Sequence, residues 1–205
     1  MSKKLSITVM AHPSRERNII YLTQRLPAFG LVFDRGDGIW DTCKRAWESR
    51  PGDAAFHLVL QDDALVCDRF DERATAALTR DMAHSFYFGW RRNYEQNAQM
   101  WKAMGEAVLP TLHWGLAVCL PERLIDPMLA HGDASDLPDT HDDTRIRDFL
   151  RYRGERVRYP FPSLIDHRPE VSLVTGEYNP VRRALRFIDK RDDEDEIRDA
   201  WKVGK

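Results

Sequence analysis

The sequence lacks a long hydrophobic run, and it has few cysteines. No apolar stretch approaches the roughly 20 residues of a membrane-spanning helix, and His12-Pro13 interrupts the N-terminal apolar segment too early for a signal peptide. Cys43, Cys67 and Cys119 are odd in number and show no CxxC spacing. This pattern argues against a disulfide framework and favours buried thiols in a reducing compartment. We therefore expect a cytoplasmic protein with no membrane partner.

A strong charge of either sign is also missing. Lys and Arg total 31 against 33 Asp and Glu, for a net charge of −2, which excludes the global basic field that drives nonspecific nucleic-acid binding. The chain has 205 residues, of which 42% are hydrophobic, and no internal repeat or low-complexity linker. These values predict one core.

Strand and helix patterns alternate in the first half. We expect strands at 5–11 and 31–33, and a third that starts at Phe56 and ends at Asp62-Asp63. A helix follows each strand, and the three helices end near Leu26, Pro51 and Met82. Three such units predict parallel strands with right-handed crossovers. In the second half we expect strands at 85–90, 111–120 and 157–159, the last of them an edge strand. We expect helices at 94–109, through 124–129, and from 142 or 143 to 153, with a loop at 131–140.

The most informative segment runs from Phe56 to Val66, because an apolar strand pattern is interrupted by Asp62-Asp63. Strand ends are where open α/β sheets place ligands, and carboxylate oxygens there suit Mg²⁺ or Mn²⁺ with a phosphate. The two side chains should point to opposite faces unless a turn begins between them. The alternative is a solvated turn or a helix cap.

Other polar positions have a structural and a functional interpretation. Asp142-Asp143 fits a helix N-cap or a catalytic base. His167 fits an ordinary hydrogen-bonded histidine, and Trp114-Gly115 fits core packing. His12 can be explained as a turn residue before Pro13, and Arg15 can be explained as a solvated charge.

The order of these features resembles that of a GT-A glycosyltransferase over roughly residues 5–175. The segment LVLQDDA at 58–64 is similar to the DxD region, especially the Glu-Asp-Asp version of lipooligosaccharide and collagen-type galactosyltransferases. Here Gln61 stands where the first acid would be. The resemblance, closest to small bacterial or bacteriophage members, implies an α/β, Rossmann-type, mostly parallel central sheet flanked by helices in a single domain.

The resemblance also implies roles for individual residues. Asp63 and His167 would bind the metal, Mn²⁺ or Mg²⁺, with the histidine favouring Mn²⁺. Asp142 or Asp143 would be the general base of an inverting reaction, and we favour Asp143. The donor would contact Ala11, His12, Pro13, Arg15, Asp34, Gln61, Asp62, Trp114 and Gly115.

We accordingly divide the chain into a catalytic domain at 1–178 and a helical, charged tail at 179–205. The predicted function is metal-dependent transfer of a sugar from a nucleotide-diphosphate donor to an acceptor hydroxyl, in the host cytoplasm if the chain is phage-encoded. Aromatic and basic residues at 86–94 suggest a modified DNA base as acceptor, although core packing explains the aromatics equally; protein and saccharide acceptors stay open. The alternatives are a metal-dependent nucleotidyltransferase and a noncatalytic interaction module. The sequence leaves open the donor base, the sugar and the oligomeric state.

Overall fold

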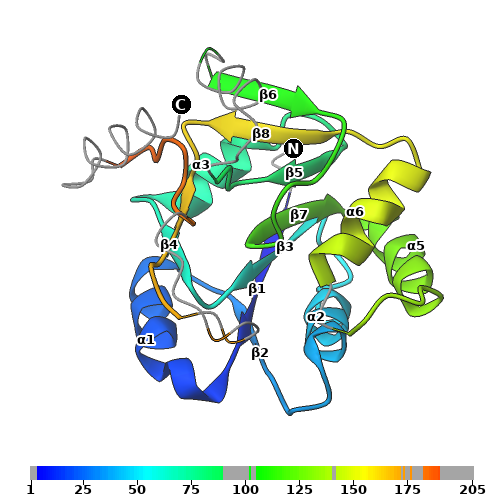
Figure 1. Ribbon diagram of the computed structural model, residues 1–205. Coiled ribbons are helices and arrows are strands. Elements are labelled where there is room, and N and C mark those ends of the chain that lie inside the picture. The colour runs from blue at the N-terminus through cyan, green and yellow to red at the C-terminus, as the bar shows by residue number, and fades with distance from the viewer. Residues whose placement is uncertain are drawn as a thin grey trace, which may run out of the picture.

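The three strand and helix units of the first half build one side of a central sheet (Figure 1). They comprise β1 (Leu5–Ala11), α1 (Glu16–Arg25), β2 (Gly30–Phe33), α2 (Ile39–Glu48) and β3 (Phe56–Gln61). Strand β1 lies between β2 and β3 and pairs with both in parallel, as predicted. The computed structural model describes residues 4–89, 102, 105–139, 142–171, 173, 176 and 182–189.

The second half extends this sheet to seven strands, in the order β2-β1-β3-β7-β5-β8-β6. The added strands are β5 (Ala83–Ser85), β6 (Gly105–Leu109), β7 (Ala117–Pro121) and β8 (Val157–Phe161). Strands β6 and β7 run antiparallel to their neighbours, and the other five point the same way. The chain is thus a mixed α/β domain with a mostly parallel central sheet, and the predicted fold class is confirmed.

Helices cover both faces of the sheet. Figure 1 shows α2, α5 (Glu122–Asp133) and α6 (Asp142–Tyr152) on one side. On the other side lie α1, α3 (Phe70–Ala77) and a small antiparallel sheet of β4 (Ala64–Val66) and β9 (Ile165–His167). Successive residues of β3 feed the two cores alternately: Val59 packs with the α2, α5 and α6 side, while Leu58 and Leu60 pack with the α1 and α3 side.

Several predicted elements of the second half are wrong. The strand expected at 85–90 ends at Ser85, and the helix expected at 94–109 gives way to β6 at 105–109; most of 94–104 lies outside the described residues. Trp114-Gly115 lies before β7, not inside a strand. Strand β8 is interior, between β5 and β6. The common reason is long-range pairing, which overrides local propensity.

The boundary proposed at 178/179 lies outside the described residues, as does most of the charged tail. Its described part, 182–189, pairs through isolated bridges, Gly89 with Ala184 and Ser163 with Phe187. Ala184 is fully buried. Within the described ranges, no helix has the length and apolar character needed to cross a membrane.

Candidate functional site

The carboxyl ends of β1, β2 and β3 meet at one edge of the sheet. Ala11 pairs with Phe33 and Met10 with Gln61, and the Asp34 N–H donates to the Ala11 carbonyl at 2.8 Å. A cavity of about 240 Å³ opens there. Eight of the predicted site residues line it: Ala11, His12, Arg15, Asp34, Gln61, Asp62, Asp63 and Asp142.

The Asp62-Asp63 pair occupies a turn. Strand β3 ends at Gln61 and β4 begins at Ala64, so the buried strand ends at the acid pair, as the sequence predicted. Because the turn breaks the alternation of side chains, both carboxylates reach Arg15 Nη1, at 2.8 Å from Asp62 Oδ1 and 2.9 Å from Asp63 Oδ2. The backbone N–H of His12 also donates to Asp62 Oδ2 at 2.7 Å.

Arg15 is a largely buried cation, with 11% of its side chain exposed, and the interpretation as a solvated charge is wrong. Burial disfavours the guanidinium charge, but hydrogen bonds and attraction from Asp62 and Asp63 outweigh it and raise the pKa of Arg15. Its Nη2 donates to the Val171 carbonyl at 2.9 Å, and its Nε lies 3.5 Å from Glu170 Oε2. Arg15 therefore joins the acid pair to the segment that follows β9.

His167, the last residue of β9, faces Asp63, with 3.5 Å between Nε2 and Asp63 Oδ2. Its Nδ1 lies 2.7 Å from the Arg168 carbonyl oxygen. A carbonyl only accepts, so Nδ1 carries a hydrogen, and Nε2 is the ring nitrogen that faces Asp63. Asp63 Oδ1 is buried and has no hydrogen-bond partner among the residues that the structure describes.

These two side chains fit a divalent cation with a short protein ligand set. Their 3.5 Å separation is less than twice a metal–ligand distance of about 2.1 Å, so both atoms can contact one ion. Across the described part of the chain, no group of three or more His, Cys, Asp or Glu is placed to hold a metal. The remaining ligands would come from substrate phosphates and water, as is usual for Mg²⁺.

The second acid pair opens α6. Asp142 is buried and lines the cavity. Burial, followed by the charge of Asp143, raises its pKa to about 7, although backbone hydrogen bonds in the first helical turn act in the opposite direction. Asp143 packs elsewhere: a Cβ placed on Gly115 would lie 2.7 Å from Asp143 Cβ. Gly115 thus allows the chain before β7 to approach the start of α6.

The predicted residues that do not line the cavity are Pro13, Trp114, Gly115, Asp143 and His167. Pro13 is exposed in a short 3₁₀ helix whose N-terminus is capped by His12: Nδ1 of His12 accepts from the Ser14 N–H at 3.2 Å. Trp114 packs edge-on against Tyr87, with ring centroids 6.3 Å apart. The turn interpretation of His12 and the packing interpretation of Trp114 therefore both describe real contacts.

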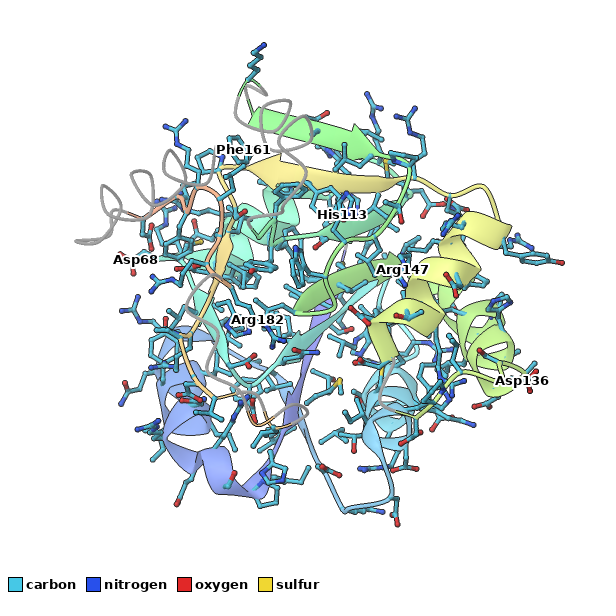
Figure 2. All side chains as sticks on the ribbon, viewed as in Figure 1. Asp68, His113, Asp136, Arg147, Phe161 and Arg182 are labelled. Atoms are coloured by element: carbon cyan, nitrogen blue, oxygen red, sulfur yellow. The ribbon has the colours of Figure 1, made fainter. Side chains whose placement is uncertain are left out.

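Sequence reasoning missed five lining residues: Met10, Ile39, Thr42, Leu173 and Arg182. Thr42 was detectable, because it lies one helical turn into α2 and its hydroxyl donates to Asp34 Oδ1 at 3.3 Å. Arg182, labelled in Figure 2, also lines the cavity. Its position depends on a buried ion pair between Arg183 and Asp166, at 2.7 Å, and on the Tyr87 hydroxyl, which donates to its carbonyl.

The aromatic segment at 86–94 does not form an exposed stacking surface in its described part. Phe86, Tyr87 and Phe88 are at most 1% exposed and pack in the two cores. The core interpretation therefore holds for these three. Residues 90–94 lie outside the described ranges.

Comparisons with known proteins give a likeness of fold. No family model matches the sequence, and no curated protein matches it. The solved structure of 4-diphosphocytidyl-2C-methyl-D-erythritol synthase from Anaerococcus prevotii is 11% identical, with a TM-score of 0.50, over 80% of this chain and 92% of that chain. A197 from STIV is 10% identical, with a TM-score of 0.51, over 91% and 95%.

The catalytic domain of Drosophila beta-1,4-galactosyltransferase 7 is 10% identical, with a TM-score of 0.49, over 95% of this chain and 78% of that chain. We draw no argument from this weaker match. The first two likenesses define the chain as a mixed α/β protein, and at these identities they show its fold alone.

Proposed function

We propose that the chain is a metal-dependent glycosyltransferase with a GT-A-like fold that moves a sugar from a nucleotide-diphosphate donor to an acceptor hydroxyl. The observation that carries the proposal is the composition of one cavity. It places strand-end acids, a buried arginine and a buried carboxyl with a pKa of about 7 around the same space. Groups far apart in sequence converge where open α/β sheets bind ligands.

The donor side of this cavity is formed by the ends of β1 and β2. Asp34 is held by the Gly36 N–H at 2.8 Å and by Thr42, so its carboxylate is fixed at the cavity wall. We assign the Asp34 carboxylate and the main chain of Ala11 and His12 to the base and ribose. Arg15, Gln61 and Asp62 lie closer to the expected diphosphate.

Asp63 and His167 would hold the divalent cation. When bound, such an ion stabilises the negative charge that develops on a diphosphate leaving group without any proton transfer. The chain contributes a hydrogen on Nδ1 of His167, which is bonded to the Arg168 carbonyl. It also contributes the buried Oδ1 of Asp63, which has no partner within the described ranges. Mn²⁺ is the better probe, because imidazole is a poor ligand for Mg²⁺.

Asp142 is the better placed of the two candidate bases, although the sequence led us to favour Asp143. Its carboxyl lines the cavity, and a pKa of about 7 suits proton transfer near neutral pH. As the acceptor oxygen bonds to the anomeric carbon, the hydroxyl proton passes to Asp142. The bond from that carbon to the phosphate oxygen breaks, releasing the nucleoside diphosphate. A single base opposite the leaving group gives inversion.

The rival reaction is nucleotidyl transfer, and the fold is shared with a protein named as a diphosphocytidyl-methylerythritol synthase. The products separate the two reactions. Incubation with uridine, guanosine or thymidine diphosphate sugars and Mn²⁺ should release nucleoside diphosphate. Release of pyrophosphate from nucleoside triphosphates, with no turnover of nucleotide sugars, would reject the proposal.

Ligand screening by thermal shift should precede the turnover assay. A donor that binds only the folded chain must raise its apparent stability. If no nucleotide sugar or metal shifts the melting temperature, the chain is better described as a noncatalytic interaction module. Because the described aromatics at 86–88 are buried, the screen should include saccharide, protein and nucleic-acid acceptors.

A further inference from the structure

We infer that Arg15 is an internal counter-ion of the metal site, which must release Asp63 before a divalent cation can bind. The inference rests on the proposed function only in taking Asp63 and His167 as the cation ligands. It concerns a competition between two positive charges for one carboxylate oxygen.

That oxygen is Asp63 Oδ2. Arg15 Nη1 donates to it at 2.9 Å, and His167 Nε2 lies 3.5 Å from it. A divalent ion bound to Asp63 and His167 would therefore lie within a few ångströms of the guanidinium. Two cations that close repel strongly in a buried site, where water screens little.

Arg15 has an alternative partner nearby. Glu170 is 12% exposed in its side chain, and its Oε2 lies 3.5 Å from Arg15 Nε and accepts from Asn18 Nδ2 at 3.0 Å. Arg15 can thus keep one carboxylate partner after it leaves Asp63. The site then loses hydrogen bonds from the guanidinium, but the charge of Arg15 keeps a carboxylate partner.

Displacement of Arg15 by the cation would also loosen residues 168–171, which we call the strap. Two contacts fasten the strap to the acid pair: the Arg168 N–H donates to the Asp63 carbonyl at 2.8 Å, and Arg15 Nη2 donates to the Val171 carbonyl at 2.9 Å. Only the second depends on where the guanidinium points. Cation binding should therefore increase motion at the Val171 end of the strap.

The main test is Mn²⁺ binding to the purified full chain without nucleotide, measured by electron paramagnetic resonance. Arg15→Gln should bind Mn²⁺ about tenfold more tightly than the wild type, because a like charge is removed. Arg15→Lys, which keeps the charge, should stay near wild type. Arg25→Gln is the matched control, because Arg25 pairs with Asp68 instead of Asp62, Asp63 or Glu170. The inference is overturned if Arg15→Gln binds Mn²⁺ no more tightly than the wild type. It is also overturned if Arg15→Gln and Arg15→Lys gain the same affinity.

A second measurement needs no variant, which matters if Arg15→Gln does not fold. Hydrogen exchange of the wild type should become faster within the strap at saturating Mn²⁺, with β4 as the internal reference. Unchanged or slower exchange in the strap overturns the inference. If Mn²⁺ binds equally well whatever residue stands at position 15, this inference fails but the proposed function does not. If the wild type turns over nucleotide sugars without binding Mn²⁺, the metal site fails in both proposals.

Discussion

The chain contains two Asp-Asp pairs beside one cavity, and the charges that surround the two pairs differ. Asp62 and Asp63 share a buried arginine at 2.8 and 2.9 Å. Asp142 is influenced most strongly, after burial, by the negative charge of Asp143. Burial raises the pKa of both Asp62 and Asp142, but the His12 N–H and Arg15 oppose this rise at Asp62, whereas the charge of Asp143 adds to it at Asp142. The same dipeptide can therefore hold a metal in one place and accept a proton in another.

The largest expected effect comes from removing the proton acceptor. Asp142→Asn should lower kcat by about 10²–10⁴-fold, the usual contribution of a general base, with little change in donor affinity. Asp143→Asn is the matched control and should cost less than about tenfold, because Asp143 packs against Gly115 and does not line the cavity. Release of nucleoside diphosphate measures both. The reverse order of effects would return the base to Asp143, as the sequence had suggested.

The next largest effect is on Mn²⁺ binding, and it distinguishes Asp63 from Asp62. Asp63→Asn should weaken Mn²⁺ binding by at least about a hundredfold, because it removes a charged ligand that His167 alone cannot replace. Asp62→Asn should keep Mn²⁺ binding within about tenfold, since Asp62 is held by the His12 N–H and Arg15. Calorimetric titration with Mn²⁺ checks both. Equal losses would mean that the two acids bind the ion together.

The pH dependence of stability tests the proton on Asp142. Its folded pKa is about 7 against an ordinary 3.8, so between these values the folded state binds the proton and the unfolded state does not. The free energy of unfolding should therefore fall as pH rises from about 4 to 7, by at most about 1.4 kcal/mol per unit, and level off above.

Asp142→Asn should flatten that slope and leave the protein more stable than the wild type at pH 8. Urea unfolding at several pH values measures the difference. Asp143→Asn should retain a slope, displaced to lower pH because the repulsion on Asp142 is relieved. If wild type and Asp142→Asn show the same pH profile, Asp142 is ionised in the folded state and the contrast between the pairs fails.

The first half of the fold was predictable because its signals are local. Regular apolar strands such as Leu5–Ala11 alternate with amphipathic helices, and parallel pairing follows from their order. Strand β6 was not predictable, because Gly105–Leu109 has no strand pattern strong enough to oppose a helix prediction and depends on β8 as its partner. Propensity loses to long-range pairing in such segments.

The site shows the same division. Asp34 and Gln61 follow from strand ends, and the structure places both at the cavity. The contact of Arg15 with both acids was not predictable, because it requires a turn between β3 and β4 that brings two adjacent side chains to one side. Nor does sequence distinguish Asp142 from Asp143. One lines a cavity and the other packs on Gly115, and that depends on tertiary burial.

The smallest effect concerns His12, which touches Asp62 through its main chain alone. Its ring accepts from the Ser14 N–H and caps a three-residue 3₁₀ helix, so His12→Ala should cost about 0.5–1 kcal/mol of stability, as for other lost caps. The backbone N–H bond to Asp62 stays, and the donor KM should change less than about threefold. Thermal melting and donor titration measure the two quantities. A large rise in KM with unchanged stability would show that the ring itself contacts the donor, and that the first acid pair depends on more than Arg15 and the backbone.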